Sequence, residues 1–341
     1  MEGKLVAGRY ELQRHLGTGE FGDVWVAHDR NLGHEVALKL LPANIDSVVV
    51  YQEATMLMTL AGEHVLPVYN ADRYDDVPYI ATKVAAGTAE DELATHPHGL
   101  RPDLAVTRTL QALVGLESCH GHGLIHRDVK PANIFLLRPD WAALGDFGAA
   151  YQMDRAGQVP PGGDPRVRST EMMKGGRGDV MSDIYSMGVT LYRLLTGEWP
   201  YQHPDWPELK RLVTTGDCRD LRDLSPHVTN ALARRVRRAM AVDRRERYQS
   251  AKEMHVDLAT VDMGRLWQPM VPHPGHRACW SEEPVDRRTP HAICVVSSGP
   301  RFAIETRRAT GARSRIAAAC LDNLRERRVP VELRRIFALL G

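Results

Sequence analysis

Short apolar stretches separated by turn-forming residues dominate the first part of the chain. Val24-Trp25-Val26-Ala27 and residues 36–41 are apolar runs bracketed by Gly, Asn and Pro, which predicts two strands. Residues 79–85 form a third apolar strand. Over residues 48–61 the apolar positions recur near helical spacing, so we expect a helix there.

The pattern changes after Gly87, where apolar positions take up helical spacing. Residues 104–119, 183–196 and 229–241 combine apolar positions with polar flanks, which predicts three helices. A small β-rich part followed by a larger α-rich part is therefore expected.

A segment rich in Pro and His, residues 268–275, predicts a linker before the last part of the chain. Beyond it, the pattern predicts strands at 292–297 and 301–307 and helices near 313–327 and 331–340. Charge also changes here: residues 265–341 hold 14 Arg, no Lys and 7 acidic residues, a net charge of +7 in a chain of net charge +1. A basic tail on a mildly acidic body indicates a second functional region.

Composition adds only broad limits. The 341 residues are 43% hydrophobic and 26% charged, which fits a globular protein of two domains, or of one large domain with an appendage. No apolar run reaches the roughly 18 residues needed to cross a bilayer, and the first residues lack the apolar stretch of a secretory signal. The five cysteines are scattered without a Cys-x-x-Cys pair, which is typical of reduced thiols, so we expect a cytoplasmic protein without membrane partners.

Gly17, Gly19, Gly22 and Val24 form a Gly-x-Gly-x-x-Gly-x-Val pattern. Glycines let the backbone approach phosphate oxygens because no Cβ stands in the way. Alone, the pattern also fits a dinucleotide-binding loop or a plain turn. The dinucleotide loop opens a helix, whereas a strand is predicted here, so that alternative is disfavoured.

Lys39 lies in the apolar run Val36-Ala37-Leu38-Lys39, where an unpaired charge would be costly to bury. One interpretation is a lysine on an edge strand that faces solvent. The other is a lysine that holds nucleotide phosphates and pairs with Glu53, which follows 14 residues later in the predicted helix.

The most specific signal is His126-Arg127-Asp128-Val129-Lys130-Pro131-Ala132-Asn133, with Asp146-Phe147-Gly148 starting 13 residues after Asn133. It matches the His-Arg-Asp-x-x-x-x-Asn and Asp-Phe-Gly motifs. With the glycine loop, Lys39 and Glu53 preceding it in order, the chain resembles the eukaryotic-like (Hanks-type) serine/threonine protein kinases, of a bacterial kind. The resemblance covers about residues 9–260.

This resemblance implies transfer of the γ-phosphate of Mg-ATP to protein Ser/Thr hydroxyls, including those of the chain itself, by positioning and electrostatic stabilisation. It implies that Asp128 accepts the hydroxyl proton, that Lys130 lies near the γ-phosphate, and that Asn133 and Asp146 bind Mg²⁺ through oxygen ligands. The nucleotide site that it implies comprises Leu16, Gly17, Gly19, Gly22, Val24, Ala37, Lys39, Glu53, Lys83, Ala85, Phe135 and Asp146.

Two later motifs are similar to structural elements of the same family. Asp183, in Ser182-Asp183-Ile184-Tyr185-Ser186, would hydrogen-bond the catalytic-loop backbone, with Tyr185 where the family has Trp. Arg247 would pair with Glu171 and lock the activation segment, residues 146–171, to the large lobe.

The activation segment departs from the family pattern. The usual Gly-Thr-x-x-Tyr reads Gly163-Asp164-Pro165-Arg166-Val167, and Ala-Pro-Glu reads Ser169-Thr170-Glu171. We expect Asp164 to pair with Lys130, because the threonine that normally bridges the catalytic Asp and Lys is missing. These changes bear on substrate docking.

The same segment contains no Ser or Thr between residues 147 and 168. Arg127 of the catalytic loop normally meets a phosphate or an acid from this segment. We therefore expect activation that does not depend on Ser/Thr phosphorylation of the loop, with Asp154 or Asp164 supplying a fixed negative charge.

The tail holds two His-x-x-Cys pairs, His276 with Cys279 and His291 with Cys294, and His273 is nearby. Zinc takes four nitrogen or sulfur ligands at such short spacing. The plainer interpretation, which the sequence favours, is a His-rich linker beside a buried strand cysteine.

The arginines of residues 301–335 can contact nucleic acid, an acidic partner or the body of the protein. Arginine without interleaved aromatic residues is a poor signal for nucleic acid, so nucleic-acid binding is disfavoured. Docking of a protein partner or self-association is the preferred interpretation of the tail.

Together these features predict an α+β chain with a bilobal protein kinase fold, a β-rich N-lobe and a helical C-lobe, plus a small α+β appendage. The predicted domains are a kinase domain at 9–262, with lobes at about 9–86 and 87–262, a linker at 263–275, and a basic module at 276–341. A catalytically weak kinase-fold scaffold and a small-molecule kinase remain alternatives. The scaffold is disfavoured because Lys39, Glu53, Asp128, Asn133 and Asp146 are all retained. A protein acceptor is favoured by Lys130 and by the predicted helix start at Asp183 to Gly188.

Overall fold

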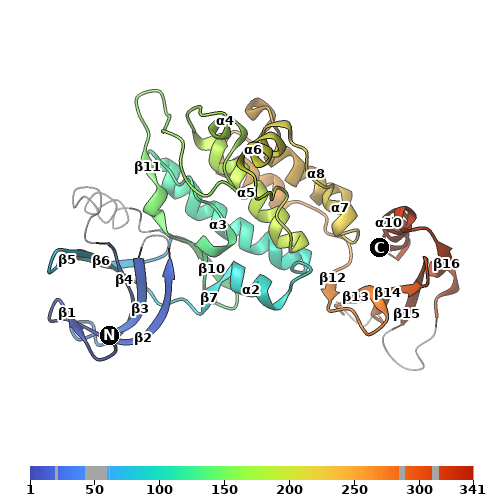
Figure 1. Cartoon of the computed structure of the whole chain (residues 1–341), viewed down its shortest axis with the longest axis horizontal. Coiled ribbons are helices and arrows are strands. Elements are labelled where there is room, and N and C mark those ends of the chain that lie inside the picture. The colour runs from blue at the N-terminus through green and yellow to red at the C-terminus, as the bar shows by residue number, and fades with distance from the viewer. Residues whose placement is uncertain (20–21, 43–59, 61, 284–288, 309–314, 341) are drawn as a thin grey trace.

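The computed structural model describes residues 1–19, 22–42, 60, 62–283, 289–308 and 315–340. Along the chain these residues form a β-rich lobe, a larger helical lobe and a module of sheet and helix (Figure 1). The predicted bilobal α+β architecture with a C-terminal appendage is therefore confirmed. The helix predicted at 48–61 falls, apart from Leu60, outside the described residues.

The N-terminal lobe is a six-stranded antiparallel sheet in the order β1-β2-β3-β4-β6-β5. One face buries a cluster that includes Tyr10, Leu38 and Tyr79. The predicted strands at 24–27 and 36–41 lie in β3 and β4, and most of 79–85 lies in β6. The strands are β1 (Leu5–Val6), β2 (Tyr10–Gly19), β3 (Gly22–Asp29), β4 (His34–Leu40), β5 (Val68–Tyr74) and β6 (Val77–Thr82).

The helical lobe is built around α3 and α5, which pack against each other and correspond to two of the predicted helices. Asp179 and Ser182 form a capping box at the start of α5, which fixes the position of its first turn. That turn carries Asp183, so the cap also orients a residue of the site. The helices are α2 (Ala89–Thr95), α3 (Pro102–Gly121), α4 (Thr170–Met173), α5 (Val180–Thr196), α6 (Trp206–Thr215), α7 (Leu221–Leu224), α8 (Asn230–Ala239) and α9 (Ala251–Ala259).

Short strands lie where the two lobes meet (Figure 1). β9 pairs with β7 and β10, and β11 of the activation segment pairs with β8, which leads into the catalytic loop. These strand pairs connect the catalytic loop and the activation segment to the helical core. Their bounds are β7 (Gly87–Thr88), β8 (Leu124–Ile125), β9 (Ile134–Arg138), β10 (Trp141–Leu144) and β11 (Tyr151–Gln152).

The C-terminal module is a five-stranded antiparallel sheet, with its strands in sequence order, packed on one helix. Its core joins Trp267, Trp280 and Ile293 of the sheet to Phe337 of the helix. The module consists of β12 (Trp267–Met270), β13 (His276–Glu282), β14 (His291–Ser298), β15 (Arg301–Arg308), β16 (Leu321–Leu324) and α10 (Val329–Leu340).

Two sequence predictions change in this module. The helix predicted near 313–327 is wrong over its described part, because Leu321 and Leu324 pair with β15 as an edge strand. Tertiary pairing here outweighs the helix propensity of the segment. Residues 267–270, within the predicted linker, form β12 and pair with β13, so the sheet begins before residue 276.

The module contacts the helical lobe through polar and aromatic groups. Trp280 Nε1 donates a hydrogen bond to Nδ1 of His227 over 3.1 Å. Burial lowers the pKa of His227 to about 3, which keeps this ring neutral and able to accept. Arg334 of α10 forms an ion pair with Asp223 of α7 at 2.7 Å. At least this tail arginine binds the body of the protein.

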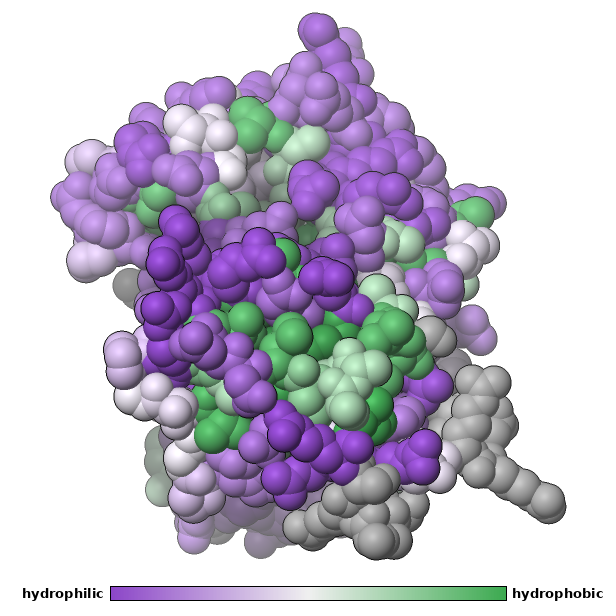
Figure 2. All heavy atoms as spheres, turned by 90° about the vertical axis from the view of Figure 1, so that its right-hand side faces the viewer, coloured by the Kyte–Doolittle hydropathy of each residue, from purple (hydrophilic) through white to green (hydrophobic). Residues whose placement is uncertain are grey.

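Apolar side chains gather in the middle of the face where the C-terminal module lies, and hydrophilic residues surround them (Figure 2). On α10, the Leu339 side chain is largely exposed. The role of this module in protein binding or self-association stays a prediction.

Within the described residues, no helix combines the length and the apolar character needed to cross a membrane.

Candidate active site

The catalytic-loop motif lies between β8 and β9, and the first turn of α5 holds its backbone. The Asp183 carboxylate accepts hydrogen bonds from the backbone N–H groups of His126 and Arg127, each at 2.8 Å. Arg127 has a φ of +65°, a left-handed conformation that costs a non-glycine residue of order 1–3 kcal/mol. The hydrogen bonds predicted between Asp183 and this backbone are confirmed, and they offset the strain.

His126 is a packing residue at the base of the loop. Its ring lies 4.7 Å from the ring of Phe147, centroid to centroid, and its Nε2 is 3.2 Å from the Gly145 carbonyl oxygen. Burial lowers the pKa of His126, so the ring is neutral near pH 7. His126 thereby connects the catalytic loop to the segment that carries Asp146.

Three donors surround the Asp128 carboxylate, which is almost fully buried. Asn133 Nδ2 donates to Oδ2 at 3.0 Å, and Lys130 Nζ lies 2.7 Å from the same oxygen. The backbone N–H of Asp164 donates to Oδ1 at 3.0 Å. The structure thus brings together the three residues that the sequence predicts as catalytic.

Lys130 joins this group to the activation segment. Its Nζ also lies 3.5 Å from Oδ2 of Asp164, so the predicted pairing of these residues is confirmed. Burial disfavours the charge of Lys130, but the neighbouring carboxylates outweigh it and raise its pKa. Asp164 also binds Arg166, and these cations outweigh burial and lower the pKa of Asp164.

Lys39 of β4 reaches Asp146 across the junction of the lobes, with its Nζ 2.6 Å from Oδ1. The interpretation of Lys39 as a lone solvent-facing lysine is therefore not supported. Asp146 has a φ of +55°, a second strained backbone position. Burial would raise the pKa of Asp146, but the charge of Lys39 lowers it, so the group is a carboxylate at neutral pH. The partner predicted for Lys39, Glu53, lies outside the described residues.

The glycine loop is the turn between β2 and β3, and residues 20 and 21 at its tip lie outside the described residues. The strand predicted after the loop is confirmed as β3. A Cβ on Gly22 would lie 2.0 Å from the Leu40 carbonyl oxygen, and the φ of Gly22 is +122°. Glycine is therefore required at this position by both space and backbone conformation.

The remaining predicted nucleotide-site residues come from both lobes. Leu16 is exposed near the end of β2, Val24 and Ala37 are half-buried on β3 and β4, and Phe135 is half-buried on β9. Lys83 and Ala85 lie in the segment between β6 and β7, where Lys83 N–H donates to the Pro67 carbonyl oxygen at 2.9 Å. Their part in nucleotide binding stays a prediction.

The expectation that Asp154 or Asp164 supplies a charge to Arg127 is wrong. Arg127 Nε donates to the Ala149 carbonyl oxygen at 2.5 Å and Nη1 to that of Pro160 at 3.1 Å. Its guanidinium also lies 4.9 Å from the Tyr151 ring centroid. Asp154 instead pairs with Arg177 at 2.7 Å. Carbonyl oxygens and an aromatic face take the place of an acid, because the segment folds back over the catalytic loop.

Gly163 is a positioning residue that sequence reasoning missed. Its φ is +76°, and a Cβ there would lie 1.8 Å from the Arg127 carbonyl oxygen. This close approach places the Asp164 N–H on the Asp128 carboxylate. The Gly162-Gly163 pair before Asp164 was the available signal, since paired glycines mark close backbone approaches.

The end of the activation segment is locked to the helical lobe as predicted. Arg247 binds Glu171 through two hydrogen bonds of 2.9 Å, one from each terminal nitrogen. The Thr170 hydroxyl, where the family has Pro, donates to the Val242 carbonyl oxygen at 2.9 Å and accepts from Arg247 at 3.0 Å. The substituted residue therefore adds to the lock.

Comparisons with known proteins agree with this geometry. The protein kinase domain family matches residues 10–257. A probable serine/threonine-protein kinase of Streptomyces coelicolor is 33% identical over 285 residues, which cover 75% of this chain and 40% of that protein. Serine/threonine-protein kinase PrkC of Bacillus subtilis is 28% identical, over 77% of this chain and 42% of its own length. PknB of Mycolicibacterium smegmatis, also a serine/threonine-protein kinase, is 30% identical, over 76% and 44%.

The chain thus spans about two fifths of the length of these curated relatives. The match to the family nevertheless extends over most of the chain, from before the glycine loop to beyond Arg247. The chain belongs to the protein kinase domain family.

Proposed function

We propose that this chain is a serine/threonine protein kinase, which transfers the γ-phosphate of Mg-ATP to protein hydroxyl groups, its own included. The observation that carries the proposal is the set of contacts that joins Asp128, Lys130 and Asn133 in the catalytic loop and pairs Asp146 with Lys39. The names of the relatives, all serine/threonine-protein kinases, support the same acceptor class.

The donor set of the site fits Mg²⁺. Asn133 uses its amide nitrogen to hold Asp128, which leaves its amide oxygen for a metal, and Asp146 supplies a carboxylate. Hard cations prefer such oxygen ligands. When bound, the ion would neutralise negative charge on the phosphate oxygens. The Lys39 ammonium beside Asp146 is a second positive charge for the same phosphates.

In this proposal Asp128 accepts the proton of the attacking hydroxyl. Its three donors hold the carboxylate in one orientation, which reduces the reorganisation needed during transfer. Lys130 keeps its charge because Asp128 and Asp164 raise its pKa, so it can stabilise the negative charge of the transferred group. Gly22 lets β3 start close to the Leu40 backbone of β4, which sets where the β2–β3 turn lies beside the proposed phosphate site.

Transfer of labelled phosphate from γ-labelled ATP, with Mg²⁺, to a generic basic protein and to the chain itself tests this proposal. We expect label on Ser and Thr, and a loss on the order of 10²-fold or more in Lys39→Met, because one electrostatic contact to the phosphates is lost. Lys252→Met, at an exposed site on α9, is the matched control and should retain activity.

Two outcomes of this assay would contradict the proposal. Absence of label from all proteins, with ATP consumed only when a small-molecule acceptor is added, would favour a small-molecule kinase. Absence of any ATP turnover in folded protein would favour a scaffold.

The activation segment should be competent without Ser/Thr phosphorylation. Its only hydroxyls at the C-terminal end, Ser169 and Thr170, are 0% and 2% exposed, and Thr170 is engaged by Arg247. Because neither can reach a second active site without local unfolding, treatment with a Ser/Thr phosphatase should leave the rate of transfer unchanged. Mass spectrometry before and after treatment checks the state of the segment. A phosphate at Ser169 or Thr170 whose removal slows transfer would overturn this expectation.

A further inference from the structure

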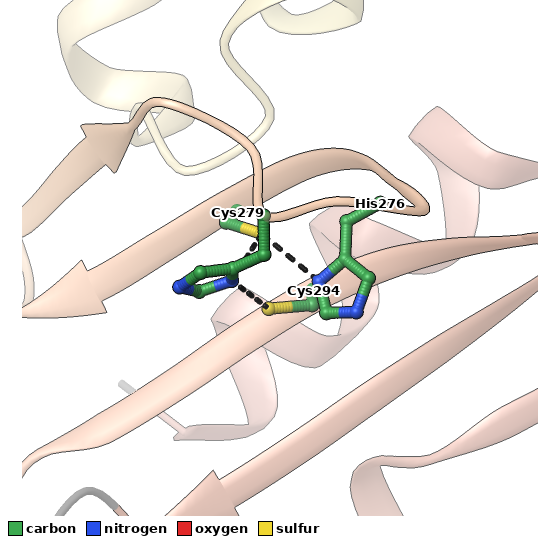
Figure 3. A group of neighbouring side chains, drawn as sticks. His276, Cys279 and Cys294 are labelled. Carbon is green, nitrogen blue, oxygen red and sulfur yellow. Dashed lines mark hydrogen bonds between the residues drawn. The ribbon is translucent and has the colours of Figure 1, made fainter.

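Four potential metal ligands converge on one face of the C-terminal sheet, far along the chain from the catalytic loop. They are His273, His276, Cys279 and Cys294, and their ligand atoms all lie within 4.8 Å of one another. His276, Cys279 and Cys294 direct their side chains toward a common point above β13 and β14 (Figure 3). No contact described for the active site uses these residues.

The pairing of β13 with β14 explains why the two cysteines meet. Cys279 and Cys294 are directly opposed across the antiparallel ladder, so their side chains leave the sheet on the same face. Their neighbours Trp280 and Ile293 point to the other face and enter the core of the module. Strand alternation therefore separates a polar ligand face from the hydrophobic face.

A bulge brings His276 onto the same face. Cys279 is three positions after His276, so in a regular strand the two side chains would point to opposite faces. The register shifts between His276 and Ala278, so that His276 pairs with Val296, two residues from Cys294. The extra residue in β13 thus reverses the alternation. His276 Nδ1 lies 3.3 Å from the Cys279 sulfur.

A tight turn supplies the fourth ligand. The His276 N–H donates to the His273 carbonyl oxygen at 2.9 Å, and Gly275 in the turn has a φ of +83°. Pro274 followed by glycine at positive φ is the sequence that a type II turn favours. The turn folds His273 over the sheet, with its Nδ1 3.3 Å from the Cys279 sulfur and 3.9 Å from the Cys294 sulfur.

These separations match those of tetrahedral zinc ligands. Zn–S and Zn–N bonds of about 2.3 and 2.05 Å at the tetrahedral angle place nitrogen and sulfur about 3.6 Å apart. Three of the four nitrogen–sulfur pairs lie at 3.3, 3.3 and 3.9 Å, which bracket that value, and all four ligand atoms lie within 4.8 Å of one another. Two nitrogen and two sulfur ligands in this arrangement are typical of zinc. Cys279 is buried and His273 is exposed, so an ion can enter from solvent.

We propose that His273, His276, Cys279 and Cys294 form a structural zinc site that fastens the β12–β13 turn to β14. Four protein ligands complete the coordination of zinc, which is the arrangement of structural rather than catalytic sites. The ion would fix the sheet that carries Trp280, and Trp280 contacts the helical lobe through His227. The site would thereby stabilise the strand through which the module contacts the helical lobe.

The ligand set differs from the two His-x-x-Cys pairs in the sequence. His291 is three residues from Cys294 in the regular strand β14, so it points to the opposite face. There its Nδ1 lies 2.7 Å from Glu282, which also pairs with Arg265. His273, from the turn, takes the position that the sequence pattern gives to His291.

Metal analysis of the purified full chain, produced with zinc in the medium, tests the proposal. We expect about one zinc per chain, and exchange for Co²⁺ should give the absorption of tetrahedral cobalt with thiolate ligands. Cys294→Ser and His273→Ala should each weaken zinc binding by at least ~100-fold in a competition with a chromophoric chelator. His291→Gln and Cys320→Ser are matched controls outside the cluster and should keep the zinc.

Three results would overturn the site. One is metal-free wild-type protein in which Cys279 and Cys294 both react as free thiols. Another is a Cys279–Cys294 disulfide in protein purified under reducing conditions, because the ladder also permits that bond. The third is loss of zinc in His291→Gln with retention in His273→Ala. Thermal unfolding with and without a chelator is a second measurement, for the wild type and for each variant that folds. Bound zinc should raise the unfolding temperature.

Discussion

Asp128→Asn should reduce phosphate transfer by about 10²- to 10⁴-fold, the range expected when a general base is removed. Asparagine keeps the size of the side chain but cannot take the proton of the acceptor hydroxyl. It also replaces one carboxylate oxygen by an NH₂ group, which would face donors from Asn133, Lys130 or Asp164. The measurement is the initial rate of labelled-phosphate transfer at saturating Mg-ATP.

The loss must arise from chemistry rather than from unfolding. Asp128 is buried, so circular dichroism and ATP binding of the variant should be compared with those of the wild type. Asp140→Asn is the matched control, because its side chain is 83% exposed and its charge change is the same. Equal rates in Asp128→Asn and the wild type would assign the transfer to another protein in the preparation.

The sequence motif of the catalytic loop places its three predicted catalytic residues close together because their spacing is short. Asp128, Lys130 and Asn133 lie within six residues, so one turn of backbone is enough to bring them together. Asp183 and Arg247 are distant in sequence, but each follows a family motif whose role is structural. The pairing of Asp164 with Lys130 could be anticipated because a charged residue had replaced the threonine that normally fills this position.

The partners of Arg127 could not be predicted in this way. Its contacts are carbonyl oxygens of Ala149 and Pro160, and every residue carries a carbonyl group. Only the path of the activation segment, set by β11 and by the close approach at Gly163, determines which carbonyls face the guanidinium. The acidic residues of the segment therefore do not indicate the partners of Arg127.

The metal ligands proposed in the tail could not be predicted from residue spacing either. The spacing of His291 and Cys294 equals that of His276 and Cys279, yet one pair shares a face and the other does not. The difference is one bulged residue in β13, and no spacing rule reveals it. In the same way, residues 321–324 form a strand because β15 offers an edge to pair with, although the segment is compatible with a helix.

The lock at the end of the activation segment combines several contacts on one buried cation. The Arg247 side chain is 0% exposed, binds Glu171 with both terminal nitrogens, and lies 4.8 Å from the Tyr185 ring centroid. A tyrosine where the family has tryptophan thus still offers an aromatic face to the guanidinium. Burial would raise the pKa of Glu171, but Arg247 outweighs it and lowers that pKa to about 2.

Arg247→Ala should lower the free energy of unfolding by about 3–5 kcal/mol, because it leaves the Glu171 carboxylate half-buried without its cation. The pKa of Glu171 is about 2 in the folded protein against an ordinary value of 4.5, so its stabilising effect is complete above about pH 4.5 and is lost as the pH falls toward 2. The difference between variant and wild type should therefore shrink over that range. Denaturant unfolding at pH 7 and at the lowest pH where the wild type folds reversibly measures both effects.

Arg211→Ala is the control for the loss of an arginine ion pair as such. Arg211 binds Glu208 and Asp217 on the surface of the helical lobe, where water screens the charges, so its replacement should have little effect on stability at either pH. If Arg247→Ala unfolds at the same denaturant concentration as Arg211→Ala, the buried pair does not lock the segment. If instead Arg247→Ala is destabilised but still transfers phosphate at the wild-type rate while folded, the lock serves stability and not the presentation of the acceptor to Asp128.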